Sequence, residues 1–115
     1  MPYNIDGGEY YFASEPFLRN NKNYVPLRDT IETLGGKVEF DNATKTATAT
    51  IASYAATVTE GDKSVDVSGQ AVTLTAAPLI ENGEMFVPFD FFRDAYGYVT
   101  QFDNGTVTIT NPNAA

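Results

Sequence analysis

Paired carboxylates offer this 115-residue sequence its most direct route to catalysis. Asp90 and Asp94 stand four residues apart, a spacing that puts two side chains on one face of a helix. Two carboxylates on one face can act as a general acid and a general base, and Arg93 lies between them in the sequence. The alternative, which we favour, is a solvated helix face with Asp90 near the helix N-terminus, where a negative charge is stabilised.

A second group of carboxylates could collect a calcium ion, which prefers oxygen ligands. Its members are Glu60, Asp62 and Asp66. The group lacks the alternating Asp positions and the glycine that wrap oxygens around one calcium ion. We therefore expect a solvated turn and strand edge here, with no metal and no cofactor in the protein.

Aromatic rings are the candidates for binding a ligand or partner, and we single out Tyr10, Tyr11, Phe91 and Tyr98. In a strand, Tyr11 faces opposite to Tyr10 and Phe12, so at least one ring reaches the surface. Phe91 lies off the apolar stripe of a predicted helix, and Tyr98 follows that helix. Exposed rings can stack on sugars or bind a partner. The alternative is that two small sheets pack on each other and bury these rings.

Composition excludes other chemistry. The sequence has no His and no Cys, which excludes a Ser-His-Asp triad, a catalytic thiol, a zinc finger and an imidazole copper site. Its net charge of −8 argues against binding a nucleic acid, whose phosphates need Lys and Arg. No run of about twenty apolar residues is present, so no transmembrane segment is expected. Residues 1–20 also lack the basic and apolar regions of a signal peptide.

The secondary-structure elements that carry these residues are predicted to be mostly strands. Fourteen Thr, nine Val and five Ile outnumber five Leu, and β-branched residues suit a pleated surface. The sequence also repeats itself at an offset of 62. Nine identities share this offset: Gly7/Gly69, Pro16/Pro78, Asn20/Asn82, Val25/Val87, Pro26/Pro88, Gly35/Gly97, Phe40/Phe102, Asp41/Asp103 and Asn42/Asn104. We therefore predict two tandem repeats, 1–60 and 61–115, packed as one unit.

Each repeat is predicted to be a small antiparallel sheet curled around one short helix, which makes the fold class α+β. The helices are predicted over 26–34 and 88–96, and Gly35 and Gly97 end them with positive φ. Residues 47–59 contain no Gly, Pro or charged residue, although flexible linkers are rich in these types. We therefore predict that this segment is paired strand that couples the repeats. The predicted strands are 3–6, 9–13, 17–19, 23–25, 37–41, 46–51, 54–59, 64–67, 71–74, 79–80, 85–87, 98–102 and 106–110.

Arg28 follows Val-Pro-Leu in the first turn of the first predicted helix. A cation there faces the positive end of the helix dipole and needs compensation. Asp29, Glu32 or a strand carboxylate could supply it, so we favour a structural ion pair over a ligand contact.

Several of these segments together resemble a known family. The chain is similar to the copper amine oxidase N-terminal-like domain over three segments: Tyr24-Val25-Pro26-Leu27-Arg28, Leu34-Gly35-Gly36 and Val38-Glu39-Phe40-Asp41. Residues 61–88 have a similar pattern. The resemblance implies a stalk of antiparallel sheet around one helix, carrying neither copper nor quinone. Such domains occur in tandem on secreted and surface-attached proteins of Gram-positive bacteria.

The resemblance implies a non-catalytic spacer, anchoring or interaction module of a bacterial cell-envelope protein, extracellular or at the cell surface. Its partner would be a cell-wall polysaccharide or another envelope protein. A second hypothesis is a carbohydrate- or peptidoglycan-binding module that uses the exposed tyrosines. A third, a small hydrolase using Asp90 and Asp94, is disfavoured because a unit of about 60 residues has little volume for a deep pocket.

Overall fold

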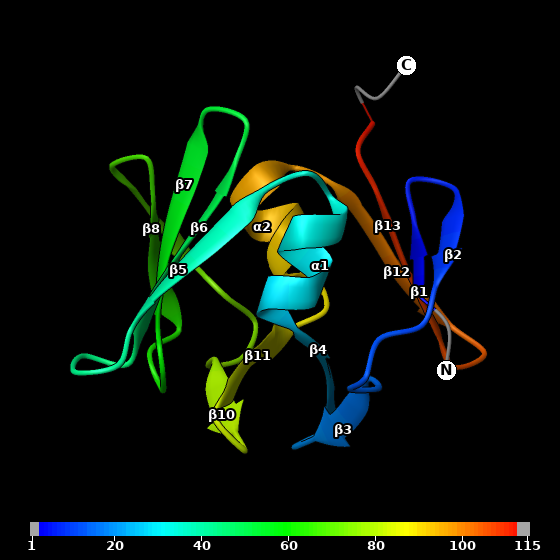
Figure 1. Cartoon of the computed structure of the whole chain (residues 1–115), viewed down its shortest axis with the longest axis horizontal. Coiled ribbons are helices and arrows are strands. Elements are labelled where there is room, and N and C mark those ends of the chain that lie inside the picture. Colours follow the sequence, from blue (N-terminus) through cyan, green and yellow to red (C-terminus); the bar gives the residue numbers. More distant parts are fainter. Residues whose placement is uncertain (1–2, 113–115) are drawn as a thin grey trace.

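The structure, a computed structural model, describes residues 3–112. Strand makes up most of this part of the chain, with two short helices, α1 (Leu27–Thr33) and α2 (Phe91–Tyr96) (Figure 1). The strands are β1 (Tyr3–Ile5), β2 (Gly8–Tyr10), β3 (Phe17–Arg19), β4 (Lys22–Pro26), β5 (Lys37–Asp41), β6 (Thr46–Ile51), β7 (Tyr54–Thr59), β8 (Ser64–Val67), β9 (Gln70–Thr73), β10 (Leu79–Glu81), β11 (Glu84–Pro88), β12 (Val99–Asp103) and β13 (Thr106–Thr110).

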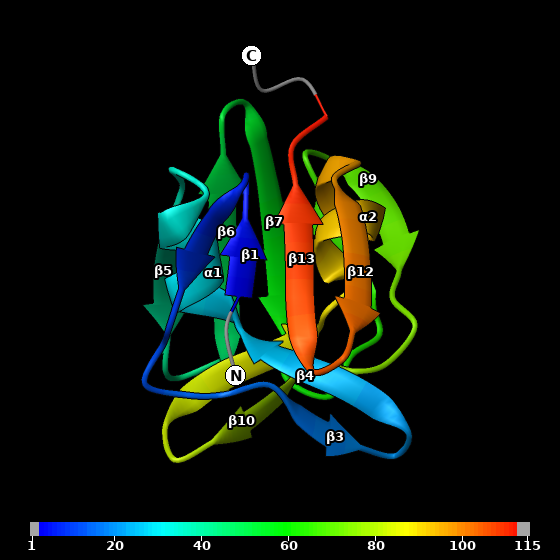
Figure 2. The same cartoon turned by 90° about the vertical axis from the view of Figure 1, so that its right-hand side faces the viewer.

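Three sheets surround the helices. A five-stranded sheet has the order β5-β6-β7-β8-β9, and a four-stranded sheet has the order β12-β13-β1-β2. These two sheets face each other with both helices between them, as the two perpendicular views show (Figures 1 and 2). A second four-stranded sheet, β10-β11-β4-β3, closes the lower end. The α+β class is thus a mostly β architecture with a helical centre.

The sheets do not divide between residues 1–60 and 61–115. Each of the three contains strands from both halves. The hairpin β1–β2 joins β13 in parallel, with Tyr3 opposite Val107, and Figure 2 shows the two strands side by side. The hairpin β8–β9 joins β7, which pairs with β6. Our expectation that each half has its own sheet around its own helix is therefore wrong, because the N-terminal hairpin of each half completes the sheet of the other.

The lower sheet joins the two halves at its centre. β4 and β11 are antiparallel with Val25 opposite Val87, two residues that are 62 apart. Residues that are 62 positions apart therefore occupy equivalent places on the two sides of this strand pair. Arg19 and Glu81, which are also 62 apart, form an ion pair. The bounds of β3 and β10, of β4 and β11, and of β5 and β12 are each shifted by 62.

The segment over 47–59 forms paired strand, as predicted. β6 alternates between buried and partly exposed side chains, and Ala47, Ala49 and Ile51 point into the core. β7 pairs with β6 along its whole length and with β8 on its other side. The segment therefore links strands from both halves within one sheet.

Both helices end as predicted but are shorter than expected. Gly35 and Gly97 follow them with φ of 89° and 76°. α2 begins at Phe91 rather than at Pro88, because the Phe89 backbone N–H donates to the Asn23 carbonyl oxygen at 2.9 Å and prolongs the pairing of β11 with β4. The buried side chains of α2 are Phe91, Phe92 and Ala95.

Candidate functional site

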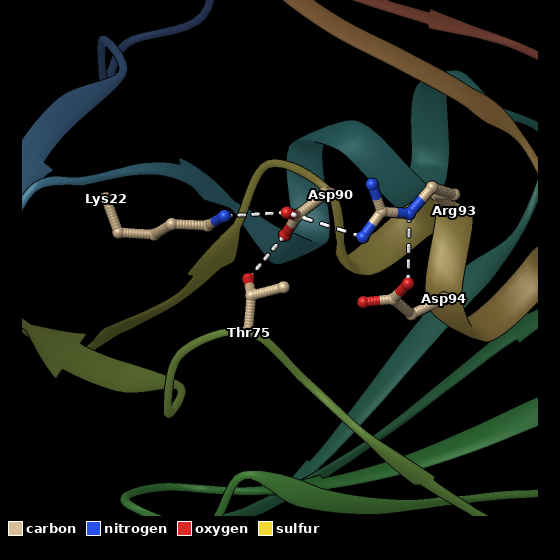
Figure 3. Close-up of polar contacts among 5 residues, drawn as sticks. All are labelled: Lys22, Thr75, Asp90, Arg93 and Asp94. Carbon is tan, nitrogen blue, oxygen red and sulfur yellow. Dashed lines mark hydrogen bonds and ion pairs between the residues drawn. The ribbon is translucent and has the colours of Figure 1, made fainter.

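The Asp90 carboxylate is the centre of a buried polar network (Figure 3). Its Oδ2 lies 2.6 Å from Lys22 Nζ and 3.7 Å from Arg93 Nη2. Its Oδ1 accepts a hydrogen bond from the Thr75 hydroxyl at 2.8 Å. The Asp90 side chain is only 5% exposed. The carboxylate is therefore fully engaged within the protein, which contradicts our expectation of a solvated helix face.

Local structure explains how Asp90 reaches this position. Asp90 precedes the first residue of α2, and its carbonyl oxygen accepts the N–H groups of Arg93 and Asp94 at 3.1 Å each. The hydrogen bond of Phe89 to β4 holds this turn against Lys22, whose Nζ lies 5.3 Å from the centre of the Phe89 ring. A cation over an aromatic face adds a second favourable contact for Lys22.

Asp94 does not pair with Asp90 in an acid/base arrangement. It accepts a hydrogen bond from Arg93 Nε at 3.0 Å, and Figure 3 shows the arginine between the two carboxylates. This hydrogen bond raises the pKa of the Arg93 guanidinium. Each carboxylate is therefore paired with a cation at the start of the helix, where a negative charge is favoured.

The four aromatic candidates divide into two kinds. Tyr11 is 70% exposed and Tyr10 40%, so both can meet a ligand. Phe91 is fully buried, and Tyr98 is only 8% exposed. The suggestion that these last two rings reach the surface is wrong, and the alternative, burial, holds for both. Phe91 packs against Phe92 with ring centres 5.0 Å apart, and Tyr98 packs against Tyr96 at 5.9 Å.

Other exposed apolar side chains were not among the sequence candidates. They are Leu18, Phe40, Tyr54 and Val99. Three of the four lie on strands at a sheet edge, β3, β5 and β12. An edge strand can be identified only from the strand order, so the spacing of these residues in the sequence did not predict their exposure.

The remaining charged candidates have structural roles. Asp62 Oδ1 accepts the Ser64 N–H at 2.9 Å, and Asp66 Oδ2 accepts the Gly69 N–H at 3.2 Å, so both serve their own turns. Among residues 3–112, no cluster of acidic, His or Cys side chains could hold a metal ion. Arg28 lies 3.6 Å from Glu32, which confirms the predicted ion pair.

A pocket of about 160 Å³ lies at the start of α1 and was not predicted. Its lining includes Arg28 and Asp29 from α1, Glu84 from β11, and the buried Leu27 and Ala47. The pocket brings together residues from both halves of the chain. Two larger grooves are both lined in part by Arg19, and Glu81 lines one of them.

No helix within residues 3–112 is long and apolar enough to cross a membrane. A comparison with curated proteins gives no match. The model of the copper amine oxidase N-terminal domain family matches residues 4–111, almost the whole chain. The match includes both helices, all of the strands except the first residue of β1, and the polar network around Asp90. The chain belongs to the copper amine oxidase N-terminal domain family.

Proposed function

We propose that the chain is a non-catalytic spacer, anchoring or interaction module of a bacterial cell-envelope protein, extracellular or at the cell surface. The family supports this proposal, since the N-terminal domain of copper amine oxidases is typically a non-catalytic accessory domain. Within the proposal, the two halves are copies of one unit that exchange their N-terminal hairpins and fold together as one body.

The observation that carries the proposal is the state of Asp90. It is the most buried carboxylate of the acid/base candidates, and Lys22, Thr75 and Arg93 hold it. A general acid or base must reach the proton that it transfers. Asp90 instead joins the start of α2 to Lys22 of β4, which is a structural role and supports a non-catalytic module.

The assay for this role uses the isolated chain with copper(II) and a primary amine. We expect no release of hydrogen peroxide above that of the metal alone, because no imidazole is present to hold copper. Sustained peroxide release that scales with protein concentration would contradict the accessory role.

A second candidate, a carbohydrate- or peptidoglycan-binding module, is favoured by the setting of Tyr10. A Cβ at Gly8 would lie 2.9 Å from Cε2 of Tyr10, so the ring lies directly over the glycine. The ring also stacks near Phe12, with centres 6.5 Å apart, and Tyr11 beside it is 70% exposed. An aromatic ring that is fixed and exposed on one side suits stacking against a sugar ring.

Co-sedimentation with insoluble cell-wall fragments separates the spacer role from the carbohydrate-binding role. The spacer role predicts that the chain stays in the supernatant. The carbohydrate-binding role predicts sedimentation that Tyr10→Ala or Tyr11→Ala reduces at least tenfold. Tyr54→Ala is the matched control, because Tyr54 is also about half exposed but lies on β7 in another sheet.

A further inference from the structure

The N-terminal hairpin, β1–β2, is joined to the rest of its sheet through one short parallel ladder. The ladder pairs three residues of β1 with three of β13: Tyr3 with Val107, Asn4 with Thr108 and Ile5 with Ile109. Just beyond it, the Asp6 backbone N–H donates to the Ile109 carbonyl oxygen at 3.0 Å, and Asp6 Oδ1 accepts the Asn111 N–H at 2.7 Å. The hairpin therefore takes its place only when the first and the last described strands meet.

Residues 3–14, which we call the arm, form a unit with internal contacts of its own. β1 pairs with β2, and the Tyr3 hydroxyl donates to the Ser14 carbonyl oxygen at 2.8 Å. The centre of the Phe12 ring lies 4.4 Å from that of Tyr3 and 6.5 Å from that of Tyr10. Because these contacts stay within the arm, it keeps them on whichever strand it is seated.

The connection between the arm and the rest of the chain is suited to act as a hinge. Residues 11–16, between β2 and β3, are the longest connection between two elements in the described chain, and none of them is buried. Figure 2 shows this connection leaving the sheet and reaching β3 at the lower end of the molecule. The Pro16 ring fixes its own φ and biases Glu15 toward extended backbone. A hinge with this bias lets the arm reach a second chain at little cost.

The internal repeat contains a second hairpin in the equivalent place. Val65 and Val67 of β8 stand 62 positions after Tyr3 and Ile5 of β1, and all four side chains are buried. β8–β9 completes its sheet on β7, the strand just before it in the chain, whereas β1–β2 completes its sheet on β13, about a hundred positions away. Of the two hairpins, only β1–β2 depends on closing the chain from one end to the other.

An unseated arm would expose apolar side chains to water. Tyr3 is 0% exposed and Ile5 2% when the arm is seated, and Val107 and Ile109 of β13 are each 0% exposed. β13 of a second copy offers the same partners in the same register, so exchange of the arm preserves this burial. Exchange of an identical element is a low-cost route to dimers. A short connection gives the arm an effective concentration on the order of 1 mM at its own β13, so exchange competes as the protein concentration approaches that value.

We infer that the chain associates with a second copy of itself by exchanging the arm, so that β1 of one copy pairs with β13 of the other. Reciprocal exchange gives a closed dimer, and one-way exchange gives a head-to-tail chain. The inference goes beyond the accessory role and does not depend on it. Its surface is the face of β13 that β1 covers within one chain, and its partner is the arm itself.

The test uses single cysteines, because the natural chain has none. Asn4→Cys and Thr108→Cys are made in separate chains; the two positions are opposite each other on β1 and β13 and are partly exposed. The two variants are mixed in urea, refolded together at about 1 mM and treated with a short bismaleimide. Cross-linked heterodimers, identified by mass, form between these positions only when the arm of one copy lies on β13 of another.

A second pair of variants controls for random contact between chains. Thr57→Cys and Asp66→Cys lie opposite each other on β7 and β8, and both positions are exposed. These strands follow each other in the chain and stay together when the arm is exchanged. We expect the mixture of Asn4→Cys and Thr108→Cys to give at least tenfold more heterodimer than the mixture of Thr57→Cys and Asp66→Cys.

Two further measurements make the result decisive. One chain with both Asn4→Cys and Thr108→Cys should cross-link within itself at about 1 μM, which shows that the two positions react when paired. Light scattering of the natural chain, refolded at about 1 mM, should give a species of at least twice the monomer mass. Equal heterodimer in the two mixtures, or a monomer mass alone in light scattering, would overturn the inference.

Discussion

Lys22→Met tests the ion pair that links the two halves. The substitution keeps most of the aliphatic chain but leaves the Asp90 carboxylate, 5% exposed, without its closest cation. Removing one partner from a buried pair costs about 3–5 kcal/mol. The Lys22 side chain is 23% exposed and Arg93 stays 3.7 Å from the same oxygen, so both reduce this cost. We therefore expect Lys22→Met to lower the free energy of unfolding by about 2–3 kcal/mol.

The assay is urea unfolding followed by circular dichroism, with Lys37→Met as the control. Lys37 is exposed on β5, and its loss should change stability by less than about 0.5 kcal/mol. Adding Asp90→Asn to Lys22→Met should recover at least about 1 kcal/mol, because no uncompensated charge remains buried. A cost for Lys22→Met no larger than that for Lys37→Met would show that the Lys22–Asp90 ion pair does not stabilise the fold.

Three further predictions concern packing, pH and metal. Gly36→Ala should destabilise the chain by about 2 kcal/mol or more in urea unfolding, because a Cβ there would overlap the Thr50 carbonyl oxygen; an unchanged midpoint would contradict this. Burial raises the pKa of the Tyr3 and Tyr96 hydroxyls in the folded chain, so folding favours their protonated forms. This stabilisation should persist up to the unfolded pKa of about 10 and be lost as the pH rises above it. Unfolding measured between pH 8 and 11 checks this, and a flat profile would count against it. Metal analysis after dialysis against copper(II) should find no stoichiometric tightly bound copper, and one copper per chain would show that the missing imidazoles are dispensable.

Local signals in the sequence predicted most elements correctly. Alternation and turn residues located β6 and β7 to within a residue, and the glycine positions identified the ends of both helices. These features depend on a few neighbouring residues, since a strand alternates with period two and a left-handed residue ends a helix.

Long-range pairing could not be predicted in the same way. The parallel pairing of β1 with β13 joins residues about a hundred positions apart, and no local pattern specifies it. The start of α2 was wrong for a related reason, because a hydrogen bond from Phe89 to Asn23 decides it. That bond joins positions 66 residues apart, so no local pattern indicates it.

The most direct test of the account is whether the two halves fold separately. Residues 1–60 and 61–115 are expressed as fragments, and urea unfolding is compared with that of the intact chain. Because all three sheets mix strands from both halves, we predict that neither fragment melts cooperatively alone and that an equimolar mixture regains a cooperative transition. Two fragments that each melt cooperatively, with midpoints equal to that of the intact chain, would contradict the interlocked fold.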